Sequence, residues 1–267
     1  MSTKDSKKTT KEKAAAARAE AEATQRGRDR RVRIIGGVVI LALVAGIIGV
    51  GVYGAHKNAP VTGIVADAAV PKGVNASGGT YPWGVVYNTA ASKPTMAIWE
   101  DFECPSCGAL EAKMGKNITK LADDGKVNLI WRPTAFLDAK FVTSANSKSS
   151  LRATAAWGCA IDAGKVKEFH TVMFANQPAT EGIGWTEQQL LDFGTQAGIT
   201  GDAYSTYEGC VKDGTYMQWA SNSNQTFSDD GIPGTPTAFL NGTEVTSEVM
   251  NDAVKLEKAI SDAAAAK

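Results

Sequence analysis

Histidine and cysteine are both scarce in this sequence. Its 267 residues include two histidines and four cysteines. Two histidines are too few for a histidine-rich metal site. His56 lies in a stretch of linker composition and His170 in a helical pattern. We therefore expect no catalytic histidine, and we interpret His170 as an ordinary packed or surface residue.

Net charge is also missing, because 28 basic and 28 acidic residues cancel. The charges are nevertheless unevenly distributed. Residues 1–33 contain eleven Lys or Arg and five acidic residues, so by subtraction the rest of the chain carries seventeen basic and twenty-three acidic residues. We interpret residues 1–33 as a solvated basic tail, suited to contact with anionic lipid, that has no catalytic role. We expect no nucleic-acid partner.

Charged side chains are completely absent from residues 34–55, in which only Tyr53 carries a polar side chain. An apolar run of this length predicts one transmembrane helix. The basic cluster Arg26–Arg33 precedes the run, whereas Lys57 is the only Lys or Arg between that cluster and Lys72. By the positive-inside rule, we expect a single-pass protein of the cell membrane with a cytoplasmic N-terminus and an extracytoplasmic domain.

Two other export signals remain open. A cleaved signal peptide usually has an apolar region of ~7–15 residues, which is shorter than this run, and the small residues Ala66 and Ala68 lie well beyond it. Arg30–Arg31 resembles a twin-arginine signal, but Arg33 interrupts the apolar residues that should follow. Both alternatives also place the domain outside the membrane, where four cysteines indicate disulfide chemistry.

The composition divides the chain into four segments. The segment between the apolar run and the next periodic pattern is rich in Ala, Val, Gly, Pro and Asn, which is typical of a tether. No internal repeat is evident. The predicted segments are a tail over residues 1–33, a transmembrane helix over 34–55, a tether over 56–80 and a folded domain over 81–267.

The folded domain begins with a predicted βαβ unit. Thr95–Phe102 is short, apolar and partly β-favouring, and Lys126–Pro133 alternates between apolar and polar residues, so both are predicted strands. Between them, apolar residues recur at steps of three and four from Pro105 to near Gly125, which predicts an amphipathic helix. The residues of this apolar stripe are Cys107, Leu110, Met114, Ile118 and Leu121.

The domain ends with a predicted ββα unit. Asn241–Gly242 between two short apolar segments predicts a tight hairpin, and Val249, Ala253, Leu256 and Ile260 predict one helix after it. The intervening residues, about 134–232, have mostly helical patterns and form a predicted insertion. Its expected helices are Ser149–Ala163, Val166–Asn176, Thr186–Ala197 with a capping box from Thr186 to Gln189, Ala203–Lys212 and Tyr216–Phe227.

The stretch Glu103–Gly108, ECPSCG, places two cysteines three positions apart at the end of a strand. Proline is well suited to the first position of a helix, so Pro105 puts Cys104 at the N-cap. Unpaired amides and the helix dipole there lower the pKa of a thiol and favour its thiolate. Cys107 belongs to the buried stripe. We therefore expect an exposed Cys104 that forms mixed disulfides and a sheltered Cys107 that resolves them, with no metal or organic cofactor.

Other interpretations of these residues remain open. A static Cys104–Cys107 disulfide would close a very short loop and stabilise the fold little. A structural zinc site would normally need a second close pair, but Cys159 and Cys210 are far apart in sequence. The neighbouring acids Glu100, Asp101 and Glu103 oppose a thiolate by their charge. One of them can relay a proton to Cys107, or all three can be solvated charges at a strand end.

Several of these features together resemble DsbA-like thiol–disulfide oxidoreductases of the thioredoxin superfamily. They are DFECPSCG after a strand, a helical insertion, TPT before a hairpin and a closing helix, and they are most similar to the membrane-anchored actinobacterial type. The resemblance implies an α/β thioredoxin fold, βαβ plus ββα with a large helical insertion, preceded by one transmembrane helix. It covers residues 81–265.

The resemblance also implies roles for individual residues. Cys104 matches the attacking cysteine and Cys107 the resolving cysteine. Pro236 matches the cis-proline of the family, with Thr235 before it offering backbone to an extended substrate; Pro233 is a less well placed candidate. Ser106 stands where the best-known members have histidine. Loss of that cation implies a reduction potential between ~−270 mV and ~−120 mV.

For the remaining cysteines, the resemblance implies a structural disulfide, Cys159–Cys210, within the insertion. Closing so long a loop would contribute roughly 4 kcal/mol on the chain-entropy model. A redox relay from this pair to Cys104 is the alternative.

The resemblance predicts an extracytoplasmic enzyme that introduces disulfides into exported proteins. The expected partners are reduced exported proteins and a quinone-linked membrane reoxidase of DsbB or VKOR type. A disulfide reductase or isomerase of the same fold remains an alternative, although no added dimerisation segment is seen. A non-catalytic anchored binding protein in which all four cysteines are structural is another.

Overall fold

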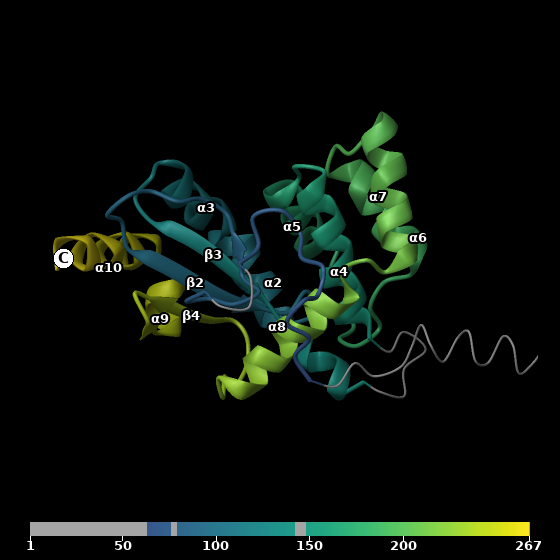
Figure 1. The fold of residues 1–267 in the computed structure, drawn as a ribbon. Helices are drawn as coiled ribbons and strands as arrows, with labels where there is room; N and C mark the ends of the chain where they lie inside the picture. Colours follow the sequence, from purple (N-terminus) through teal and green to yellow (C-terminus); the bar gives the residue numbers. More distant parts are fainter. Residues whose placement is uncertain (1–62, 76–78, 142–147, 267) are drawn as a thin grey trace, which may run out of the picture. The chain divides into compact units, whose positions relative to one another are not determined.

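The computed structural model describes residues 63–75, 79–141 and 148–266 (Figure 1). The chain divides into two units, Met1–Pro60 and Val61–Lys267, and every described residue belongs to the second. The predicted tail and transmembrane helix therefore lie outside the described residues. Within the described ranges, no helix is long and apolar enough to cross a membrane.

A five-stranded sheet in the order β1-β3-β2-β4-β5 forms the centre of the domain. β2 and β3 are parallel, with Ile98 opposite Trp131, and the other pairs are antiparallel. The residues of β2 from Met96 to Trp99 have no exposed surface, because both faces of this central strand are covered. The strands are β1 Val85–Val86, β2 Thr95–Glu100, β3 Asn128–Pro133, β4 Thr237–Leu240 and β5 Thr243–Val245.

The helix between β2 and β3 follows the predicted apolar stripe. It consists of α2 Pro105–Leu110, a π-helical turn η1 Glu111–Gly115 and α3 Lys116–Asp123. All five residues of the stripe are buried, and Gly125 after the last turn adopts a left-handed φ of 66°. The predicted βαβ unit is therefore present. The π-helical turn was not predicted from the sequence.

The insertion between β3 and β4 is helical, as predicted. α4 packs against α5, α7 and α8, and the capping box from Thr186 to Gln189 begins α6. In Figure 1 the insertion helices lie together beyond the end of the sheet where β2 meets α2. Its elements are η2 Phe136–Ala139, α4 Ser149–Asp162, α5 Val166–Ala175, α6 Glu187–Gln196, α7 Gly201–Asp213 and α8 Met217–Asp229.

The C-terminal unit contains the predicted hairpin but not the single helix expected after it. Asn241 and Gly242 have φ values of 50° and 83°, as a tight two-residue hairpin turn requires. The helix is divided into α9 Ser247–Met250 and α10 Ala253–Ala265. The division arises because Asp252 adopts an extended conformation and its carboxylate accepts the amides of Val254 and Lys255. The side chain therefore caps a new helix rather than continuing the old one.

Part of the segment predicted as a tether packs on the folded domain. The Asn222 side chain on α8 accepts the Val65 amide at 3.0 Å and donates to the Val65 carbonyl at 2.7 Å. Further along, Val74 forms an isolated bridge with Val85, and Pro71 is buried. These contacts show that described residues before position 81 belong to the same folded unit.

Candidate active site

The two cysteines of the CPSC stretch lie at the carboxyl end of β2, where the chain enters α2. Cys104 is the N-cap of α2, with extended φ and ψ of −75° and 117°, and Pro105 is its first residue. The carbonyl of Cys104 accepts a hydrogen bond from the Gly108 amide at 3.1 Å. Both cysteines are free thiols, so the structure represents the reduced form of the pair.

The two sulfurs differ less in exposure than the sequence suggested. Cys104 is 6% exposed and Cys107 is fully buried. The expectation of a freely presented Cys104 is thus wrong, because the loop before β4 lies beside it. The Cys104 sulfur lies 3.3 Å from the Thr235 carbonyl oxygen. Cys104 is still the one residue of the pair with any exposed surface.

The electrostatic difference between the sulfurs is large. Neighbouring groups lower the pKa of Cys104 to about 5, although burial opposes this. The largest effect comes from a hydrogen bond with the Cys107 thiol, and smaller effects come from the Thr235 side chain and the amides of Cys107 and Ser106. Burial, and then the hydrogen bond to Cys104, raise the pKa of Cys107 well above its usual value. The first thiol is therefore a thiolate at neutral pH and the second remains protonated.

The loop over the sulfurs contains a cis peptide bond between Thr235 and Pro236, the only one among the described residues. The peptide before Pro233 is not cis. The Thr235 hydroxyl is buried and has no hydrogen-bond partner among the described residues, and its presence beside the sulfurs lowers the pKa of both thiols. The structure thus brings together Cys104, Cys107, Thr235 and Pro236, the four residues assigned to the site from the sequence.

The pKa of Cys104 has a measurable consequence. We expect ultraviolet thiolate absorbance of the reduced chain to titrate with a midpoint near pH 5, because the thiol has a pKa of about 5. A depressed pKa stabilises the reduced fold fully above the ordinary value of 9.0, less as the pH falls, and not at all below about 5. Cys104→Ser should lack this transition. A midpoint near the ordinary value would contradict the assigned electrostatics.

Gln177, just after α5, positions the segment that carries Cys104. Its side-chain amide donates to the carbonyls of Phe102 and Cys104 at 2.8 and 2.9 Å. Its carbonyl oxygen lies so close to Gly108 that a Cβ at that position would overlap it. Sequence reasoning missed this residue, because an isolated glutamine in a loop carries no signal of such a contact.

The acidic residues before Cys104 are buried rather than solvated. Glu100, Asp101 and Glu103 are each 5% exposed or less. Asp101 accepts the amides of Glu103 and Leu137 and the hydroxyl of Ser150, and burial raises its pKa to about 8. The interpretation of these acids as solvated charges is wrong. Through these hydrogen bonds, Asp101 instead connects the end of β2 to Leu137 and Ser150 of the insertion.

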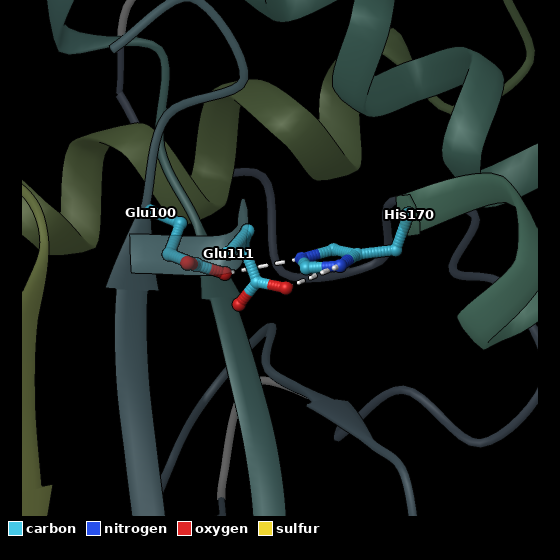
Figure 2. Close-up of side chains that lie close together, drawn as sticks. All are labelled: Glu100, Glu111 and His170. Carbon is cyan, nitrogen blue, oxygen red and sulfur yellow. Dashed lines mark hydrogen bonds and ion pairs between the residues drawn. The ribbon is translucent and has the colours of Figure 1, made fainter. Parts of the chain in front are cut away.

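Glu100 belongs to a buried group of ionisable side chains that the sequence did not reveal (Figure 2). Its Oε2 lies 3.0 Å from His170 Nε2, and Oε2 of Glu111 lies 3.9 Å from His170 Nδ1. His170 is 2% exposed, so the surface interpretation of this residue is wrong. The helical spacing that buries this face of α5 was visible in the sequence, but its acidic partners were not.

In the part of the chain that the structure describes, these three residues are the one group whose metal-ligating atoms all lie within 4.8 Å of one another. The imidazole faces the two carboxyl groups with different nitrogens. A single ion can bind only one nitrogen of a ring. The arrangement therefore matches a hydrogen-bonded group better than a shared ligand set.

Comparisons with known proteins agree with this geometry. A family model described as Thioredoxin matches residues 82–262. Reduced DsbA from Mycobacterium tuberculosis is 26% identical, with a TM-score of 0.51 over 74% of this chain and 96% of that one. MdbA from Actinomyces oris, a thiol-disulfide oxidoreductase, is 20% identical, with a TM-score of 0.58 over 72% of this chain and 89% of that one.

Oxidised BdbD from Bacillus subtilis is also 20% identical, with a TM-score of 0.58 over 73% of this chain and 98% of that one. At this identity, the MdbA and BdbD matches show the fold alone. No curated protein matches the sequence.

Proposed function

This chain belongs to the thioredoxin family and is a DsbA-like thiol–disulfide oxidoreductase, and we propose that it acts outside the cell membrane to introduce disulfides into exported proteins. One observation carries the proposal: Cys104 stands at the N-cap of α2 beside the cis Thr235–Pro236 bond, with surroundings that lower its pKa to about 5, while burial raises the pKa of Cys107. A thiol that is stable as thiolate favours the reduced form of the pair, so the oxidised form is an electron acceptor.

In the proposed reaction, a thiolate of the reduced substrate attacks Cys104 of the Cys104–Cys107 disulfide. The bond between the two enzyme sulfurs breaks, and Cys107 leaves with the electron pair and takes a proton. A second substrate thiolate then attacks the substrate sulfur of the mixed disulfide and releases Cys104 as its thiolate. The substrate is oxidised by two electrons and the enzyme pair is reduced by two.

The surroundings of Cys104 support each step. Thr235 and the amides at the start of α2 stabilise the thiolate that leaves last. Gln177 holds the carbonyl of Cys104 in place. The Cys104–Cys107 disulfide is the only redox group that this chemistry requires, so the proposed enzyme needs no further cofactor. A quinone-linked membrane protein of DsbB or VKOR type would then reoxidise the pair.

The membrane location in this proposal rests on sequence patterns that lie outside the described residues. They are the apolar run over residues 34–55 and the basic cluster before it. The boundaries of the tail and of the transmembrane helix remain predictions. The proposed substrates follow from that location, because pairs of reduced cysteines are delivered there during protein export.

The direction of the reaction is tested by equilibrating the full-length chain in detergent with mixtures of reduced and oxidised glutathione. We expect a reduction potential between ~−270 mV and ~−120 mV, and we expect the oxidised chain to form the disulfide of a reduced, unfolded substrate. Cys104→Ser is the control. A potential more negative than this interval would indicate a reductase, and activity on scrambled substrates alone would indicate an isomerase.

A further inference from the structure

Arg132 is a buried cation that the proposed reaction does not use. It belongs to β3, and only 6% of its surface is exposed. Its Nη1 lies 3.0 Å from Oδ2 of Asp230, whereas its Nε and Nη2 are buried and have no hydrogen-bond partner among the described residues. Within the described ranges, Asp230 is therefore the one acceptor that this guanidinium has. A buried charge is costly unless it is paired, so its place in the fold depends on that contact.

The guanidinium lies on the face of the sheet that α8 covers. Its central carbon is 3.8 Å from the centre of the Trp99 ring, a distance at which a cation is attracted to an aromatic face. Trp99 also packs edge-on against Phe227 of α8, with ring centres 5.3 Å apart. In the sheet, Trp99 lies between Arg132 of β3 and Thr237 of β4. Arg132 is therefore two strands away from the residue at which the chain returns to the sheet after α8.

Asp230 places the other half of the ion pair at the start of a loop, residues 231–236, which connects α8 to β4 (Figure 1). It is the C-cap residue of α8, and its side chain is 43% exposed. At the other end of the loop, the Thr237 hydroxyl donates to the Gly234 carbonyl at 2.8 Å. The ion pair thus joins the beginning of the loop to the sheet, and a hydrogen bond within the chain orders its end.

The same loop carries Thr235, whose carbonyl oxygen lies 3.3 Å from the Cys104 sulfur. Thr235 is only partly buried. A substrate sulfur bonded to Cys104 lies about 2 Å from the Cys104 sulfur, so the backbone of a polypeptide substrate must pass beside Thr235. A small thiol has no flanking backbone. The position of the loop therefore matters for a polypeptide substrate and not for a small thiol.

Other contacts hold α8 in place without the ion pair. The Ser223 hydroxyl donates to the Pro133 carbonyl, and Oδ1 of Asn224 accepts the Ala135 amide at 3.0 Å. These hydrogen bonds attach the middle of α8 to the end of β3 and the residues after it, whereas the ion pair attaches the end of the helix. Loss of the ion pair should therefore displace the loop rather than unfold the helix.

We propose that Arg132 is a positioning residue for the substrate, because its ion pair with Asp230 fixes the loop that presents Thr235 to a polypeptide bound at Cys104. The inference rests on the proposed function and concerns its polypeptide substrates. Lysine is an incomplete replacement, since the planar guanidinium both stacks on Trp99 and keeps a directed hydrogen bond.

The test compares Arg132→Met with the unmodified full-length chain. The oxidised forms react either with reduced, unfolded ribonuclease A or with dithiothreitol. For ribonuclease A, we expect KM to rise roughly 5- to 10-fold, the effect of about one lost hydrogen bond to the substrate, while kcat stays within about twofold. The rate with dithiothreitol should also stay within about twofold. Arg132→Lys should restore part of the change in KM.

Ser223→Ala is the matched control for Arg132→Met. It removes a hydrogen bond between α8 and β3 but leaves the ion pair in place. We expect it to lower Tm and to leave KM for ribonuclease A unchanged. Hydrogen–deuterium exchange of residues 231–236 is a second measurement, which should be faster in Arg132→Met and unchanged in Ser223→Ala.

Three results would reject the positioning role. They are a KM for ribonuclease A within about twofold of the unmodified value in Arg132→Met, an equal loss of rate with dithiothreitol, or the same rise in KM in Ser223→Ala. If Arg132→Met does not fold, Asp230→Asn decides, because it removes the charge and keeps an acceptor, and an unchanged KM rejects the role. An unmodified chain that oxidises neither substrate rejects the proposed function itself, whereas failure of the variants alone leaves that function intact.

Discussion

Replacement of Cys104 by serine is expected to reduce thiol–disulfide exchange to the uncatalysed rate, a loss on the order of 10³-fold or more. A hydroxyl in the same place has no accessible anion at neutral pH, and it cannot form a mixed disulfide. The surroundings of the residue would remain, because Pro105, Gln177 and Thr235 keep their contacts. The loss is measured as the rate of disulfide formation in a reduced protein substrate.

Cys107→Ser distinguishes the two sulfurs. With a protein that carries a disulfide as the substrate, the Cys104 thiolate attacks one of its sulfurs and the other leaves as a thiol. Without Cys107 to resolve it, this mixed disulfide should accumulate, visible as a covalent adduct that a reductant releases. Cys104→Ser should form no such adduct. If Cys107→Ser also forms no adduct, or if Cys104→Ser does form one, the roles assigned to the two cysteines would be reversed or absent.

The second large effect concerns the disulfide between Cys159 in α4 and Cys210 in α7, which the structure contains. The bond closes a loop of 51 positions, so its loss should cost roughly 4 kcal/mol of the free energy of unfolding on the chain-entropy model. For a domain of this size, that corresponds to about 8–16 °C in Tm. Cys159→Ser/Cys210→Ser should show this decrease in thermal unfolding followed by circular dichroism.

The same double variant tests whether the bond takes part in exchange. We expect its activity at low temperature to stay close to that of the unmodified chain, because Cys107, Gln177 and Thr235, which interact with Cys104, lie outside α4 and α7. Abolished exchange in a still folded variant would favour the redox relay. Alkylation of the unmodified chain after mild reduction provides the control, since Cys104 and Cys107 should be labelled readily and the Cys159–Cys210 bond should resist reduction.

Much of the fold followed from local patterns. β2, the helix after Pro105 and the hairpin at Asn241–Gly242 were predicted because burial on one face, helix capping and turn geometry depend on neighbours in sequence. β1 was not predicted, since two residues are too few for a pattern. The break at Asp252 was missed because an aspartate within an apolar stripe is also compatible with a continuous helix.

The sequence by itself determined the redox pair, the strand and helix that hold it, and the helical nature of the insertion. Each of these depends on spacing within a few residues. Only the tertiary structure decided what surrounds the pair. Glu100 and His170 are 70 positions apart, and Gln177 is 73 positions from Cys104, so their contacts depend on how the insertion packs against the sheet. A periodic pattern shows which face of α5 is buried, but the residues that this face meets are chosen by long-range packing.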